Sequence, residues 1–461
     1  MTGSRKRDSG IRTGVPPVSL TSRILARLFR PFAKVEAAES VGAAVMLLAS
    51  FLLLCAYYQL KTVREPLILL EGGAEVKLYA RAGQAVLMVG FVHVYGEIAK
   101  RVGRMELLAI VFLFFISNLV VFALLSRTNV PIGLAFFLWV GVFSYTAVAQ
   151  FWALAADIYS EEQGKRLFPI VGIGSSVGAV AGARLAKSLV PRGPYALMTA
   201  AALLLLVCMT LLAWVERRAG VAGRRREHVP EEPEQPLSDE GALHLLLRDR
   251  YLLLIAAMIV LLNWVNSAGE YVFDRTILAA VSSAGLHGAA AQSFVGAVKA
   301  DYFAWYNLLG MLMQLFAVSR ILARLGVRNA LLFNPAFSLV GYAWAAFVPT
   351  LAAFRIVKIG ENALEYSIAE TSRHALYLVT SRVEKYVGKT SVDTIAVRVG
   401  AILSGAVVWI GGRVNLSTAA FATINVVLTA ACIGVVLAIG KEHRRRRIES
   451  PMLLAAEPAT S

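Results

Sequence analysis

Residues 57–65 read Tyr-Tyr-Gln-Leu-Lys-Thr-Val-Arg-Glu and close an apolar run that begins near Val41. Lys61, Arg64 and Glu65 therefore lie on the same predicted helix as a membrane-length segment. Ionisable side chains are costly on such a helix unless they face water or a partner. Two interpretations follow. The side chains anchor the helix by reaching the headgroups, or they form a charged wall of a solute cavity.

The composition excludes an ordinary soluble enzyme. Of the 461 residues 57% are hydrophobic and only 16% are charged, and the mean hydropathy is +0.64. Such a chain has too little polar surface to cover itself in water. Apolar runs of roughly 20 residues recur along it, and each is long enough to cross about 30 Å of hydrocarbon. We predict an all-α polytopic membrane protein with twelve transmembrane helices.

A charged, proline-rich stretch at 216–250 divides the chain, and we expect it to be a flexible cytoplasmic linker. Six spans precede the linker and six follow it, so we predict a bundle at 41–215 and another at 251–440, flanked by basic segments at 1–40 and 441–461. The predicted spans are 41–65, 77–98, 106–126, 132–155, 167–188, 195–215, 251–277, 301–322, 329–349, 353–378, 391–411 and 416–440.

The formal net charge of +16 indicates topology and not nucleic-acid binding. Basic residues gather in the tails and short loops beside the apolar runs, as the positive-inside rule predicts. Residues 1–40 contain no apolar core of a signal peptide. We therefore expect a multi-pass protein of the inner, or plasma, membrane with both termini in the cytoplasm. Residues 22–34 are amphipathic and predict a short helix on the inner leaflet.

Three pairs of matching segments indicate that the second half repeats the first. Their offsets are 223, 224 and 222 residues. The pairs are Arg101-x-Gly103 with Arg324-x-Gly326, Gly164-Lys165 with Gly388-Lys389, and Gly178-Ala179 with Gly400-Ala401. Two six-helix repeats joined by a central cytoplasmic loop are the layout of the major facilitator superfamily.

The loop after the second span resembles the signature of that superfamily at Gly96, Arg101, Gly103 and Arg104, although Lys100 stands where the signature has an acid. Glycine permits a tight turn there, and the arginines pair with acids or helix carbonyls to hold the inner face shut. With Arg324 and Gly326, these residues form a predicted cytoplasmic gate. The alternative is that they are ordinary positive-inside loop charges.

Span 7 carries Asn263, Asn266, Glu270 and Asp274 on one face. An offset of 209 places Glu65 opposite Asp274 and Lys61 opposite Glu270 in the two repeats. These charges either pair with one another or bind opposite ends of one solute. The plainer alternative is that they are helix caps at a membrane edge.

Spans 10 and 11 carry further ionisable residues. Lys358, Glu361 and Glu365 share one face of span 10, and Glu365 falls near mid-bilayer, where it requires a cavity or a basic partner. An internal salt bridge meets the same need. At the start of span 11, Lys389 opposes the helix dipole, so anion binding explains it better than helix stability. Asp393 and Arg398 follow on the same predicted helix.

Three segments resemble the nucleotide exchange transporters, the ATP/ADP carriers of obligate intracellular bacteria and plastids. They are Tyr58-Gln-Leu-Lys-Thr-Val-Arg-Glu65, Phe151-Trp-Ala-Leu-Ala-Ala-Asp157 with Glu162 to Pro169, and Lys385-x-x-Gly388-Lys389 with Asp393. The resemblance implies electroneutral exchange of nucleotides by a twelve-helix carrier. It also implies that Arg64 and Lys389 bind phosphate, and that Glu270 or Asn266 matches an acid of that family in span 7.

We therefore expect a secondary transporter whose halves rock about a central cavity and move a small anionic solute, with a nucleotide as a candidate. The alternatives are a proton-coupled carrier or flippase of another solute, and a non-transporting receptor on the same fold. We expect a monomer in membrane lipid with no nucleic-acid partner, no cofactor and no metal. No enzyme motif is present, since Gly172-x-Gly174 suits helix packing. The expected binding residues are Tyr57, Lys61, Arg64, Glu65, Asn266, Glu270, Asp274, Lys358, Glu361, Glu365, Lys389, Asp393 and Arg398.

Overall fold

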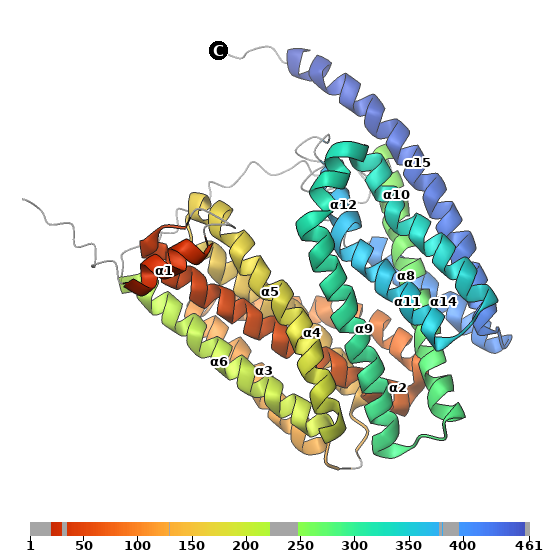
Figure 1. Ribbon diagram of the computed structural model, residues 1–461, viewed down its shortest axis with the longest axis horizontal. Helices are drawn as coiled ribbons and strands as arrows, with labels where there is room; N and C mark the ends of the chain where they lie inside the picture. Colours follow the sequence, from red (N-terminus) through yellow and green to blue (C-terminus); the bar gives the residue numbers. More distant parts are fainter. Residues whose placement is uncertain are drawn as a thin grey trace, which may run out of the picture.

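The computed structural model describes residues 20–29, 35–128, 130–221, 248–377, 380 and 396–456, and the secondary structure within these ranges is helical. Two groups of helices follow a short leading helix, α1 (Leu20–Phe29), as Figure 1 shows. The N-terminal group contains α2 (Ala37–Ala99), α3 (Arg104–Leu125), α4 (Gly133–Ile158), α5 (Glu161–Leu189), η1 (Val190–Arg192) and α6 (Pro194–Val221). The C-terminal group contains α8 (Arg250–Ser283), α9 (Gly288–Phe316), α10 (Val318–Phe347), α11 (Leu351–Leu364), η2 (Glu365–Ala369), α12 (Glu370–Leu376), α14 (Val397–Arg413) and α15 (Thr418–Ala456).

Helix α2 is two passes joined by a turn at Gly73. This glycine has a φ of 80°, a backbone conformation that side chains with a Cβ rarely adopt. Lys77 and Glu65 form an ion pair across the turn. On a straight helix they would lie about 18 Å apart, so the chain must fold back on itself. The predicted break between the first two spans is therefore a tight turn at a single glycine.

The described residues form the twelve helical passes that the apolar runs predict. Among these residues, eight helices are long and apolar enough to cross a membrane by length and composition, with α2 counted once. The second segment of α2, α9, the α11–η2–α12 segment and α14 supply the other four. Two boundaries differ from expectation. Helix α9 begins at Gly288 and not near 301, and the predicted loop at 319–328 is mostly helical, with a turn at Gly326 (φ 73°).

Glycines let α5 pack directly on the backbone of α2. A Cβ added to Gly174, Gly178 or Gly182 would overlap the carbonyl oxygen of Leu47, Phe51 or Cys55, respectively. Small residues at this spacing allow close helix approach in membranes. The C-terminal group repeats the arrangement, because a Cβ on Gly400 of α14 would overlap the carbonyl oxygen of Val260 in α8.

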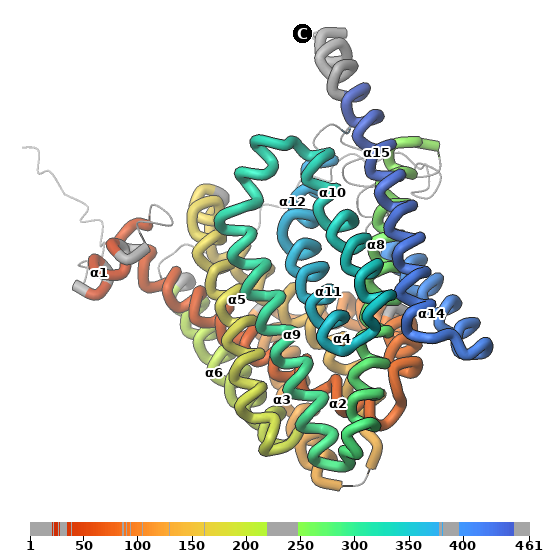
Figure 2. The backbone as a smooth tube through the Cα atoms, turned by 45° about the vertical axis from the view of Figure 1, so that its right-hand side comes forward, coloured from red at the N-terminus to blue at the C-terminus, as the bar shows by residue number. Residues whose placement is uncertain are grey.

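We call the side at which α2 begins and α15 ends the terminus side, and the opposite side the far side. The α5–α6 and α8–α9 connections lie on the far side, at the bottom of Figure 1, and the view of Figure 2 keeps the α8–α9 connection opposite the end of α15. The two groups separate toward the top of Figure 1. Between described residues, the hydrogen bonds and ion pairs that join the groups all lie toward the far side, among residues 58–81, 184–187 and 270–306.

One apolar core also joins the groups. It includes Ile68, Leu69 and Leu78 of α2 with Val272 and Ile277 of α8. A separate core lies within the N-terminal group, around Phe112, Phe136 and Phe151. The structure is therefore closed toward the far side.

Candidate functional site

Six ionisable side chains meet where the two groups join. We call them the ion-pair cluster: Glu65, Lys77 and Arg81 of α2, Glu270 and Asp274 of α8, and Lys299 of α9. The Lys77 ammonium lies 2.9 Å from Glu270 and 2.7 Å from Asp274, and it also pairs with Glu65. Lys299 pairs with Asp274 and lies 3.4 Å from Glu65. Arg81 pairs with Glu270.

The cluster is almost completely buried. The side chains of Glu65 and Lys299 are 0% exposed, and those of Lys77 and Asp274 are 2% exposed. A lone charge at such a site costs several kcal/mol, and pairing is what makes it tolerable. Within the cluster three cations face three carboxylates, and Arg64 beside it also pairs with Glu65. Four of the pairs cross from one group to the other, so the cluster ties the far sides of the groups together.

The cluster has the symmetry of the sequence repeat. Lys299 follows Lys77 by 299 − 77 = 222 residues, and Asp274 follows Glu65 by 274 − 65 = 209 residues. Each half thus supplies one lysine and one carboxylate from equivalent positions. The same two offsets relate Gly178 and Phe51 to Gly400 and Val260 in the helix packing. The repeat inferred from loops is therefore present in the side-chain contacts.

The expected pairing of the first helix with span 7 is wrong in its partners. Glu270 and Asp274 do pair with cations of α2, but through Lys77 and Arg81 and not through Lys61 or Arg64. Arg64 instead pairs with its neighbour Glu65 at 3.1 Å, and its guanidinium lies 4.6 Å from the centre of the Phe137 ring. Sequence reasoning missed Lys77, Arg81 and Lys299, although the 222-residue offset relates the two lysines.

Lys61 lies about one turn closer to the terminus side than the cluster, among aromatic rings. Its ammonium donates to the Tyr306 hydroxyl at 2.9 Å and lies 4.8 Å from the centre of the Phe303 ring and 5.2 Å from that of Tyr58. Tyr58 and Tyr306 are hydrogen-bonded. No described carboxylate lies within ion-pair distance of Lys61. Its nearest described partners are therefore π faces and a hydroxyl.

Two tyrosines extend this aromatic site toward the terminus side. Tyr57 packs against Tyr58, and Tyr366 of η2 stacks on Tyr306. Tyr366 is 60% exposed, so one side of its ring is open. We call Tyr57, Tyr58, Lys61, Phe303, Tyr306 and Tyr366 the Lys61 site. It presents a cation together with aromatic rings, which is a combination suited to an anion that carries a planar ring.

Lys358 and Glu361 form an internal ion pair of α11, which is one of the two alternatives that the sequence allowed. Their ion pair measures 2.7 Å, and Tyr342 donates to the same Glu361 oxygen at 2.7 Å. Lys358 also donates to the backbone carbonyl of Asn266 at 3.1 Å. The Asn266 side chain bonds to Asn362. This network joins α8, α10 and α11 within the C-terminal group.

Glu365 has the basic partner that its depth required. It lies 3.0 Å from Arg373 and accepts from Asn334 at 2.7 Å. It opens η2, a five-residue π-helix that interrupts an otherwise α-helical pass. Such insertions are frequent at functional sites.

The remaining predicted residues lie on the terminus side or outside the described residues. Gly103 caps α3, Arg104 begins α3, and Gly96 lies in the last turn of α2. Arg101 and Arg324 are exposed, as is Arg398 in the first turn of α14. Lys389 and Asp393 fall outside the described residues, so their predicted place on one helix with Arg398 stays a prediction.

The three carboxylates of the ion-pair cluster have oxygens within 4.8 Å of one another, which is close enough to hold a metal ion. The ammonium groups of Lys77 and Lys299 already lie among these oxygens. The charge of these carboxylates is therefore matched by lysines in this structure.

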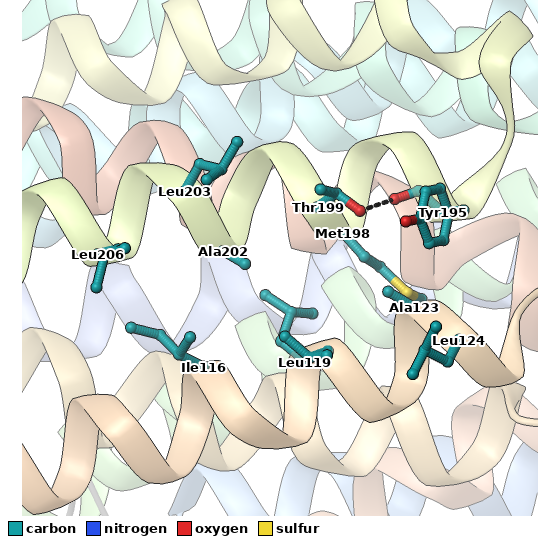
Figure 3. Close-up of a pocket in the computed structure, with 11 residues that line it drawn as sticks. Ile116, Leu119, Ala123, Leu124, Tyr195, Met198, Thr199, Ala202, Leu203 and Leu206 are labelled. Carbon is teal, nitrogen blue, oxygen red and sulfur yellow. Dashed lines mark hydrogen bonds between the residues drawn. The ribbon is translucent and has the colours of Figure 1, made fainter.

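A separate apolar groove of about 260 Å³ lies between α3 and α6. Figure 3 shows Leu119, Ala123, Met198 and Ala202 along it, and its one drawn hydrogen bond joins Thr199 to the Tyr195 backbone carbonyl. None of the residues of the ion-pair cluster or the Lys61 site lines this groove.

The sequence matches no protein family model and no curated protein. Solved structures of several transporters are similar in fold. The nucleoside transporter NupG is 13% identical, with 87% of this chain and 98% of that chain covered and a TM-score of 0.58. The POT family transporter PepTSo is 13% identical over 88% and 98%, with a TM-score of 0.59.

A bacterial homologue of the iron transporter ferroportin, solved in an inward-facing state, is 14% identical. The match covers 86% of this chain and 98% of the homologue, with a TM-score of 0.60. At these identities the likeness shows the fold, which is the all-α polytopic fold of major facilitator transporters. The predicted fold class is confirmed.

Proposed function

We propose that the protein is a secondary transporter that moves a small organic anion by alternating access. The observation that carries the proposal is the Lys61 site, where a cation with no carboxylate partner among the described residues lies among aromatic rings beside a cluster that joins the two groups. An ammonium group in this setting gains more from binding an anion than a paired one does. The anion would enter from the terminus side, which we assign to the cytoplasm.

The neighbouring cluster provides a means of coupling. An anion held by Lys61 lies close to Arg64, whose only described carboxylate partner is Glu65. By competing for that cation, the anion weakens the network of Glu65, Lys77 and Lys299 that ties the far side together. A ligand shifts a conformational equilibrium only through such differential contacts. The two halves, 41–215 and 251–440, would then rock about the site with 216–250 as a cytoplasmic linker.

A nucleotide is the candidate substrate that the sequence resemblance favours, because it combines a planar base with phosphate charge. The Lys61 site offers π faces for the base and a cation for the phosphate. In this proposal Lys389 and Asp393 complete recognition and the carrier works as a monomer in the inner membrane. Electroneutral exchange is what the sequence resemblance implies.

Uptake of labelled ATP into proteoliposomes tests the substrate. Internal ADP should raise uptake well above that of empty vesicles, and Lys61→Gln should abolish the difference. Lys100→Gln is the matched control, because Lys100 is an exposed lysine whose one described ion-pair partner is Glu97. If neither ATP, ADP nor other nucleotides exchange, the nucleotide assignment is wrong. A screen of other organic anions against Lys61→Gln then tests the broader proposal.

A further inference from the structure

A second cluster of charges joins the two groups at their lateral surface. Asp301 of α9 lies between three cations: Arg184 and Lys187 of α5, and Arg355 of α11. Its distances to them are 3.4, 2.7 and 3.3 Å, respectively. One carboxylate therefore faces three positive charges, two from the N-terminal group and one from the C-terminal group. The cluster keeps an excess of two positive charges.

These cations are open to the surroundings, in contrast to the buried ion-pair cluster. The side chains of Arg184 and Lys187 are each 44% exposed, and that of Arg355 is 33% exposed, whereas Asp301 is 14% exposed. The Asp301 carboxylate is therefore more buried than the three cations that surround it. The cations present positive charge at the protein surface, and Asp301 neutralises only part of it.

The surface around the cluster carries exposed apolar side chains. From Asp301 toward the terminus side, the same face of α9 carries the exposed side chains of Trp305, Leu309 and Leu312. Arg184 lies over the Trp305 ring at 5.2 Å, and Leu185 beside it is also exposed. Exposed leucines on a membrane-spanning helix contact acyl chains, and tryptophan is typical of the membrane interface.

The depth of the cluster corresponds to the headgroups. Helix α5 has 29 residues, or about 43 Å, so its ends extend beyond about 30 Å of hydrocarbon. Lys187 lies in the last turn of α5, and Arg355 lies just past the first turn of α11, which begins at Leu351. Judged from the ends of α5 and α11, the three cations belong at the far-side headgroups. Helix α9 extends beyond this level, because Asp301 is the fourteenth of its 29 residues.

We propose that Arg184, Lys187 and Arg355 bind the phosphate of an anionic phospholipid of the far-side leaflet, whose acyl chains lie along the exposed apolar face of α9. The lipid contacts both groups at once and is released when the far side opens. It therefore favours the closed far side, because a ligand stabilises the state to which it binds more tightly.

Native mass spectrometry of the purified protein, titrated with dioleoylphosphatidylglycerol and with dioleoylphosphatidylcholine, tests the site. The wild type should bind the anionic lipid more tightly. Arg184→Gln with Lys187→Gln should weaken that binding by about fivefold for each cation removed. Arg127→Gln is the matched control, because Arg127 is exposed on the far side over the Tyr195 ring but belongs to one group only. It should leave the affinity unchanged.

Asp301→Asn separates lipid binding from a purely structural ion-pair network. It removes the carboxylate and keeps all three cations, so the anionic lipid should bind at least as tightly as to the wild type. Arg355→Gln tests the site from the other group if the double variant fails to fold. The proposal is overturned if the cation variants bind the anionic lipid like the wild type, if Asp301→Asn loses as much affinity as they do, or if millimolar inorganic phosphate displaces the lipid.

Discussion

Lys61 and Lys77 lie on the two passes of α2 in opposite electrostatic settings. Lys77 contacts three carboxylates and is closed off from solvent. Lys61 contacts aromatic rings and the Tyr306 hydroxyl, and no described carboxylate lies within ion-pair distance. A buried charge that has partners is compatible with a stable fold. A buried charge that lacks them lowers stability, so its presence indicates a role in function. Substitution of the two lysines should therefore have opposite effects on stability.

Lys61→Met should stabilise the protein while it weakens anion binding. The methionine side chain keeps the contacts with Tyr58 and Phe303, and the desolvation cost of an ammonium is removed. The melting temperature should rise by a few degrees in detergent. The affinity for the transported anion should fall about tenfold or more, which is the usual value of a charge-assisted hydrogen bond. A lower melting temperature would mean that Lys61 is a structural residue.

Lys77→Met should have the opposite effect on stability. It removes a buried cation that pairs with Glu65, Glu270 and Asp274, and the loss of one partner of a buried pair costs about 3–5 kcal/mol. Chemical denaturation in detergent measures this free energy of unfolding. Lys77→Met combined with Asp274→Asn removes one charge of each sign and should recover part of the loss. Equal stability of the single and double variants would contradict the role of the cluster in holding the halves.

At the scale of the helices, close packing depends on glycines at particular positions of α5. Gly178 contacts the backbone of α2 and has no room for a methyl group, whereas Gly172, less than two turns earlier, has no atom within 4 Å of an added Cβ. Two glycines of one helix therefore differ only in what they face. The C-terminal group offers the same contrast between Gly400 and Gly405 of α14.

Gly178→Ala should destabilise the protein by about 1–3 kcal/mol, because α5 must move away from Phe51. Gly172→Ala should be neutral or slightly stabilising, since alanine favours the helix over glycine. Thermal unfolding of the two variants in the same detergent measures the difference. Similar melting temperatures for both would show that α5 and α2 do not approach as closely as described.

At the scale of the whole molecule, two equivalent lysine–carboxylate pairs from the two repeats meet on the far side and cross-link the halves. Because each lysine contacts carboxylates of both halves, opening the far side must break these pairs together. The groups meanwhile separate toward the terminus side (Figure 1). In the proposed transport cycle, the cluster would hold one of the two states that alternating access requires.

Neutralising the cluster should open the far side. The variant Glu65→Gln, Lys77→Gln, Asp274→Asn, Lys299→Gln removes two charges of each sign and leaves Arg81 paired with Glu270. Spin labels at the exposed Ser188 and Ser283, on α5 and α8, should show a population at longer distance. Labels at Thr128 and Ser188 report within one group and should not change. An unchanged distance between α5 and α8 would mean that apolar packing alone closes the far side.

Prediction from sequence succeeded where a local pattern reports a structural requirement. Apolar runs predicted the twelve passes, because each backbone segment in lipid must satisfy its own hydrogen bonds as a helix. Lys61, Glu65, Glu270 and Asp274 were singled out because charge is rare in such runs. Lys77, Arg81 and Lys299 were missed. They lie near the ends of predicted spans or outside them, where the positive-inside rule already accounts for a basic residue.

The sequence by itself determined the class of fold, the repeat and the identity of several buried carboxylates, because hydropathy and residue spacing are properties of the chain. Only the tertiary structure decided which cation meets which carboxylate. The reversal of α2 at Gly73 brings Lys77 back to Glu65, and the approach of α2 to α8 and α9 adds Asp274 and Lys299. Pairing depends on distances of a few ångströms between helices far apart in sequence, and no spacing along one helix encodes them.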